Sequence, residues 1–185
     1  MGEQHKKHSR REHLNDFHLN VAGEYVYDGA LYACQNDDAK QRRSKRAVWG
    51  MAAILTVAVA AGGCIPAPGM QNCFYVLLPY LGEFLGAASV IWALAKLGMD
   101  WGTVREYNYK KSVAVLPVRT AVTAVFSLLG IVCELIFFFV NDHAGQTFFA
   151  LLYVLLKLIA LLSVLVLRAE IMQAEWGKLP KKNNS

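Results

Sequence analysis

The sequence predicts an all-α integral membrane protein, with four transmembrane helices in an up-down bundle and both termini in the cytoplasm. The chain has 185 residues, of which 55% are hydrophobic. These residues collect in four blocks, and each block is apolar on all sides, which is typical of helices that face lipid. The charged residues collect before and between the blocks. A soluble domain would instead alternate apolar and polar residues along amphipathic elements.

The four blocks give the expected spans. A helix of about 20 apolar residues crosses the hydrocarbon core of a bilayer. The last two blocks are separated only by the sequence NDHAGQ, so their helices should be antiparallel neighbours. We expect spans at about residues 47–63, 74–96, 117–140 and 147–167.

The blocks also divide the chain into three parts. Residues 1–46 form a polar tail that precedes the first span. Residues 47–167 form the four-helix transmembrane domain. Residues 168–185 are expected to continue the last helix out of the membrane and to end in a polar tail.

A short segment of the first tail, residues 24–33 (EYVYDGALYA), has a different character. Its Asp-Gly pair at 28–29 lies between two short β-prone runs, which is the pattern of a two-residue hairpin turn. This hairpin would pair Tyr25 with Tyr32. The alternative is an interfacial segment in which the tyrosines anchor at the level of the lipid headgroups.

Basic residues indicate the orientation. Of the 19 Lys and Arg residues, 18 lie in the two tails or at the 97–112 side of the spans, and one is inside the last span. The loops at 64–73 and 141–146 contain none. The positive-inside rule then predicts cytoplasmic termini and a cytoplasmic 97–112 loop, with the plasma membrane as the expected location. Because the net charge of +5 follows this pattern, we do not expect nucleic acid as a partner.

Three ionisable residues fall inside the spans. Measured from the exoplasmic surface along ideal helices, Lys157 lies ~15 Å deep, Glu83 ~13 Å and Glu134 ~9 Å. The depth favours Glu83 as the partner of Lys157, but Glu134 is the expected partner because its helix must adjoin the last one. The second acid has no base and should be protonated, because an unpaired carboxylate is disfavoured in a low dielectric. The group is either a buried polar cluster that fixes helix register or a proton- or cation-responsive site.

Small residues predict close helix contacts. One face of the third span carries small or polar residues at spacings of three and four, and this stripe ends at Glu134. Such a stripe is typical of helix-helix packing. The second span has a small-xxx-small pair at Gly82 and Gly86. The stripe consists of Thr120, Thr123, Ser127 and Gly130.

Cysteines and histidines are the candidates for reactive or metal-ligating groups. Cys64 and Cys73 enclose the short loop on the exoplasmic side, where a disulfide is plausible. Four histidines lie among basic residues in the first tail. A polar tail explains them better than a metal site. They are His5, His8, His13 and His18.

Three functions remain open. The first is a non-enzymatic accessory or interaction subunit, whose partner is a membrane or cytoplasmic protein or a second copy of the chain. The second is a small oligomeric transporter, or an ion- or proton-responsive protein, using Glu83, Glu134 and Lys157. The third is a membrane thiol oxidoreductase using Cys64 and Cys73. The sequence has no Cys-x-x-Cys pair and no P-loop, His-Glu-x-x-His or Gly-x-Ser-x-Gly motif, so we expect no catalytic residues and no cofactor.

Overall fold

The computed structural model describes residues 17–19, 25–27, 29–98, 101–141 and 147–179. Within these residues, four helices are long and apolar enough to cross a membrane. The chain therefore has the helices of a multi-pass membrane protein, as the hydrophobic blocks predicted. The four are α2 (Asp38–Cys64), α4 (Phe74–Leu97), α6 (Leu116–Val140) and α7 (Thr147–Gln173).

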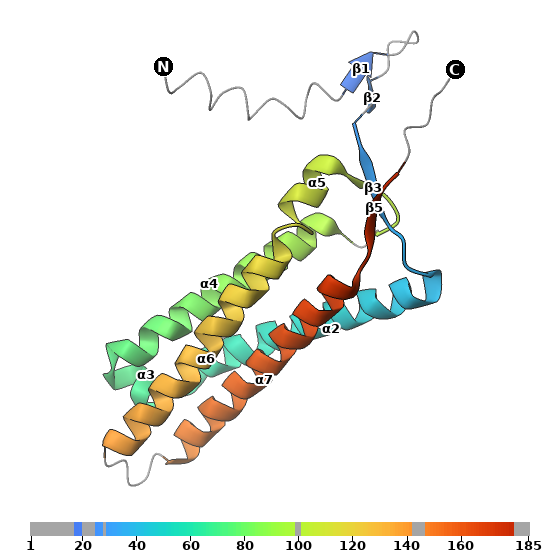
Figure 1. The fold of residues 1–185 in the computed structure, drawn as a ribbon. Helices are drawn as coiled ribbons and strands as arrows, with labels where there is room; N and C mark the ends of the chain where they lie inside the picture. The colour runs from blue at the N-terminus through green and yellow to red at the C-terminus, as the bar shows by residue number, and fades with distance from the viewer. Residues whose placement is uncertain (1–16, 20–24, 28, 99–100, 142–146, 180–185) are drawn as a thin grey trace, which may run out of the picture.

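The four long helices pack in a closed arrangement. Helix α2 contacts α4 and α7, and α6 contacts the same two helices. Helices α4 and α7 are therefore diagonal to each other, as are α2 and α6. Figure 1 shows the helices side by side, each running opposite to the one before it. This arrangement leaves the centre of the bundle to side chains from all four helices.

Two of the long helices extend beyond the expected spans. Helix α2 begins at Asp38 and includes the basic KQRRSKR segment. Lys, Arg and Gln are good helix formers, and an acidic residue in the first turn complements the helix dipole. Helix α7 continues to Gln173. Two short helices lie between the long ones: α3 (Pro68–Asn72) and α5 (Glu106–Lys111).

A small antiparallel sheet closes one end of the bundle, which we call the sheet end. Its central strand is β3 (Leu31–Cys34), flanked by β4 (Val104–Arg105) and β5 (Trp176–Lys178). These strands come from the segments before α2, between α4 and α6, and after α7 (Figure 1). The sheet therefore joins segments that are far apart in sequence.

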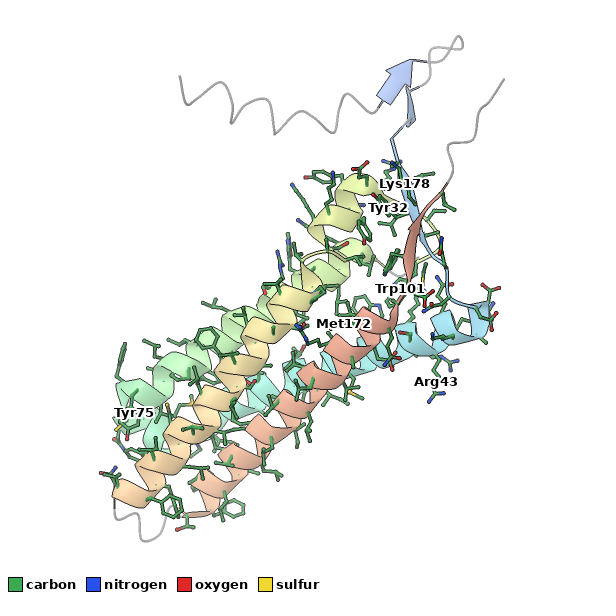
Figure 2. All side chains as sticks on the ribbon, in the orientation of Figure 1. Tyr32, Arg43, Tyr75, Trp101, Met172 and Lys178 are labelled. Atoms are coloured by element: carbon green, nitrogen blue, oxygen red, sulfur yellow. The ribbon has the colours of Figure 1, made fainter. Side chains whose placement is uncertain are left out.

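Aromatic rings pack between this sheet and the helices. Tyr32 stacks on Tyr109 of α5, with ring centroids 4.2 Å apart. Trp176 lies 6.0 Å from Trp101 and 5.9 Å from Tyr109. Figure 2 shows Tyr32 and Lys178 at the sheet end and Trp101 nearer the helices. Offset and tilted ring pairs of this kind each contribute about 0.5–1.5 kcal/mol beyond their burial.

The expected hairpin pairing is wrong. Strand β2 (Tyr25–Tyr27) pairs with β1 (Phe17–Leu19), and not with β3. Tyr32 instead faces Val104 on one side and Lys178 on the other. A two-stranded hairpin is marginal in water, and β3 is better stabilised by a partner at each edge. Asp28, the first turn residue of the expected hairpin, lies outside the described residues.

The apolar core has two layers. The larger lies under the sheet and contains side chains from all four long helices together with Trp101 and Val104. The second lies deeper in the bundle and is formed by Leu55, Ala58, Val59, Ala87, Ala160 and Val164. Small side chains in this second layer allow the helix backbones to approach closely.

The glycines of α4 lie against α6. A side chain at Gly82 would overlap the ring of Phe126, and a Cβ at Gly86 would lie 2.6 Å from Oγ1 of Thr123. The small and polar stripe of α6 is buried along its length. The α4–α6 contact therefore depends on the absence of side chains at two positions of α4.

We predict that Gly86→Ala lowers the free energy of unfolding in detergent by about 1–3 kcal/mol, the usual cost of inserting a methyl group into a close contact. Thermal unfolding measures this. The control is Gly50→Ala on α2, where nothing lies within 4 Å of the added carbon. Alanine there should leave stability unchanged or raise it slightly, because glycine weakens helices. Equal effects of the two substitutions would contradict the contact.

Candidate functional site

The candidate site is centred on Lys157, midway along α7. Its side chain is 2% exposed. The stem passes Gly130 of α6, where Cε would lie 3.7 Å from an added Cβ. The ammonium then donates a hydrogen bond to Oε2 of Glu83 and forms an ion pair with it. Since α4 and α7 are diagonal, this pair crosses the centre of the bundle.

The remaining contacts complete the surroundings of the pair. Oε1 of Glu83 accepts a hydrogen bond of 2.5 Å from the Ser127 hydroxyl. The Lys157 ammonium lies 4.5 Å from the centre of the Tyr80 ring and 5.1 Å from that of Tyr153. Aromatic faces attract a cation, and more strongly when water is excluded. The Tyr80 hydroxyl in turn donates to the carbonyl of Val59 on α2, at 3.3 Å.

All four long helices therefore contribute to the environment of one cation. A buried ion pair adds little net stability compared with apolar residues of the same size, because both charges lose their water. Removing one partner is far more costly, since it leaves an uncompensated charge. The pair thus favours this arrangement of helices over others in which Lys157 and Glu83 do not meet.

The expected pairing of Lys157 with Glu134 is wrong. The adjacency of α6 and α7 does not decide the partner, because Gly130 lies one turn before Glu134 on the same face of α6. Its missing side chain lets the lysine stem pass α6 and reach α4. The calculated depths, which put Glu83 almost level with Lys157, indicate the correct acid.

Glu134 has different surroundings, although it is fully buried. Its carboxyl lies against the backbone of Gly69 in α3, so that a side chain at Gly69 would overlap Oε2. The backbone N–H of Gly69 faces the carboxyl without reaching hydrogen-bond geometry. Among the described residues, neither carboxyl oxygen has a hydrogen-bond partner, and the same holds for the hydroxyl of Tyr153.

The two tyrosines were not identified from the sequence. Tyr80 precedes Glu83 by three positions and Tyr153 precedes Lys157 by four. Residues at these spacings share one face of a helix. An aromatic residue one turn before a buried charge was therefore a usable signal. Ser127 was assigned to helix packing, and its role as a donor to Glu83 depends on how α4 and α6 face each other.

Comparisons with protein-family models, with curated proteins and with solved structures found no match. The interior of the bundle holds the Lys157–Glu83 pair and, in separate surroundings beneath α3, the acid Glu134, which has no base beside it among the described residues. The pair can hold helices in register, and Glu134 can bind or release a proton.

The other candidate residues are not brought to the Lys157–Glu83 pair by any described contact. Cys64 is exposed and Cys73 is partly buried, and both are free thiols in the structure. Both lie at the end of the bundle that carries α3, which we call the α3 end. The side chains of the four histidines in the first tail lie outside the described residues.

We predict that Lys157→Met lowers the free energy of unfolding by about 3–5 kcal/mol, because it leaves Glu83 buried without a counter-charge. Adding Glu83→Gln should restore part of this loss, since the whole pair is then neutral. Thermal unfolding of the purified protein in detergent measures both effects.

The matched control for this prediction is Glu134→Gln in the Lys157→Met background. Glu134 is not the partner of Lys157, so its neutralisation should restore less stability than that of Glu83. Better rescue by Glu134→Gln would contradict the pairing seen in the structure. If Lys157→Met alone left stability unchanged, the ion pair would have no role in holding the helices.

Proposed function

We propose that this chain is a non-enzymatic membrane protein that acts as an accessory or interaction subunit, with both termini in the cytoplasm and the plasma membrane as its location. The observation that supports this best is the sheet end. Three segments that a membrane protein could have left as separate loops are joined there into one sheet, and aromatic rings pack it onto the helices.

The sheet end has features that suit protein recognition. Strand order β4-β3-β5 leaves an outer edge on β5, and an unpaired strand edge can accept a strand from another chain. Lys178 on β5 is exposed. Tyr107 on α5 is 41% exposed, and aromatic residues are enriched at interfaces. A partner that adds a strand to β5 would also contact the rings behind the sheet.

The distribution of charge supports the orientation. The exposed basic residues of α2 lie in its first turns, toward the sheet end, and Lys96 lies in the last turn of α4 at the same end. The loop at the α3 end, residues 65–73, has no charged side chain. Basic residues are retained on the cytoplasmic side during insertion, so we assign the sheet end to the cytoplasm.

A labelling experiment tests this orientation. In a variant with its four native cysteines replaced by serine, single cysteines are placed at Gln71 and at Gly102, which are both exposed. A membrane-impermeant thiol reagent added to intact cells should label the cysteine at 71 and leave the one at 102 unlabelled. After permeabilisation both should react. Labelling at 102 from outside would show the opposite orientation, with the sheet end outside the cytoplasm.

A crosslinking experiment tests the interaction surface. A photoreactive amino acid placed at Lys178 should give a specific adduct with a partner in native membranes, and one placed at Gln71 should not. Tyr109→Ala removes a ring that stacks on Tyr32 and packs near Trp176. It should reduce the adduct at 178 while the transmembrane helices stay folded. Adducts of equal yield at 71 and 178, or none at 178, would contradict a partner site at the sheet.

A second candidate function is favoured by a different observation. Glu134 is fully buried and has no counter-charge or hydrogen-bond partner among the described residues. Ionisable groups inside a membrane are candidates for ion or proton sites. We therefore retain the proposal of an ion- or proton-responsive protein, or a small oligomeric transporter, that uses Glu83, Glu134 and Lys157.

A further inference from the structure

We propose that Glu134 is a proton-binding site beneath α3, which carries a proton while Lys157 is paired with Glu83 and exchanges it with water through the segment at residues 65–73. This inference rests on the second candidate function, and it names the ligand, the residue and the route. The bond that breaks on release is the O–H bond of the Glu134 carboxyl, and water at the α3 end accepts the proton.

The charges inside the bundle favour a protonated Glu134. Lys157 forms an ion pair with Oε2 of Glu83, and Oε1 of the same carboxylate accepts a hydrogen bond from Ser127. A charged Glu134 would be a buried carboxylate without a counter-charge, because among the described residues the buried lysine, Lys157, is paired with Glu83. Burying such a charge without compensation costs several kcal/mol, whereas a protonated carboxyl is neutral. The geometry therefore favours the protonated acid.

The groups around Glu134 include no counter-charge among the described residues. Helix α7 presents Tyr153, and α4 presents Tyr75, both within electrostatic range of Glu134. Cys133 is its neighbour on α6, and α3 has no titratable residue (PGMQN). None of these groups carries a positive charge that could hold a carboxylate. The Tyr153 hydroxyl is likewise buried and without a hydrogen-bond partner among the described residues.

A short path connects the Glu134 carboxyl with water at the α3 end. The carboxyl faces Gly69, which is buried. Two and three residues further along α3, Gln71 and Asn72 are exposed. One short helix therefore separates the acid from the α3 end. The prolines at 66 and 68 and the glycine at 69 prevent this segment from continuing α2. The segment at residues 65–73 therefore lies between the buried Glu134 carboxyl and the α3 end.

Infrared spectroscopy of the full-length protein in lipid nanodiscs tests the proposal. A protonated carboxyl has a C=O stretching band that is distinct from the bands of carboxylates. We expect this band at neutral pH, with a shift in D₂O as the proton exchanges and a loss of intensity as the pH is raised. Glu134→Gln should remove it. Glu106→Gln, at the paired acid of α5, should leave it unchanged.

One further variant guards against misfolding. Glutamine is a neutral replacement for a protonated acid, so Glu134→Gln should fold, and thermal unfolding checks this. Should it fail to fold, Glu134→Asp keeps the acid and should shift the band instead of removing it. The proposal is overturned if the wild type lacks the band at neutral pH, if Glu134→Gln leaves it in place, or if Glu134→Asp leaves its position unchanged.

A separate measurement distinguishes this site from the function on which it rests. Because the folded protein holds a proton that the unfolded chain loses at lower pH, wild-type stability should fall as the pH rises toward the point at which the band disappears. Glu134→Gln should remove that fall. Because linkage makes this fall a consequence of the bound proton, the function needs a different readout, which is the adduct yield at Lys178 measured as a function of pH. If the band and the fall in stability are present but the adduct yield does not change with pH, the proton site stands and the proton-responsive function is contradicted.

Discussion

The ion pair between Lys157 and Glu83 is the constraint on which the arrangement of the bundle depends. A lysine near the middle of an apolar helix is costly wherever it faces lipid. This chain supplies one acid, one hydroxyl and two aromatic faces around it. These groups come from α4, α6 and α7, and one of the rings is tied to α2 through its hydroxyl. A rotation of any one helix would remove a group from the cation. The pair therefore specifies helix register more than it adds stability.

The pair in turn depends on small residues. Gly130 gives the lysine stem room to cross α6, and Gly86 allows α4 to approach α6 closely enough for Ser127 to reach Glu83. The stripe of α6 is thus both a packing face and a path for a polar side chain. This double use explains why the stripe contains a serine within hydrogen-bond reach of the acid, where packing alone would be satisfied by alanine.

The sequence could predict those features that are determined locally. Hydrophobic length determines the four long helices, and helix geometry determines the depth of each charged residue, so the level of Glu83 and Lys157 could be calculated in advance. It could not show which helices are diagonal, since that depends on packing among all four. For the same reason adjacency pointed to Glu134. Strand pairing failed more completely: Tyr32 pairs with residues 72 and 146 positions away, and an Asp-Gly turn signal carries information only about its immediate neighbours.

The Lys157–Glu83 pair and the sheet end are mechanically connected through the same helices. Helix α4 carries Glu83 and leads into the segment that contains β4, and α7 carries Lys157 and continues to β5. Both strands pair with β3. If Glu134 lost its proton, it would place an uncompensated charge beside α3, and α3 contacts both α4 and α7. Those two helices hold the opposite edges of the sheet, so a change of charge at the α3 end would act on the surface proposed to meet a partner. The two candidate functions are compatible, because the Lys157–Glu83 pair can set the helix arrangement while a proton on Glu134 makes that arrangement sensitive to pH.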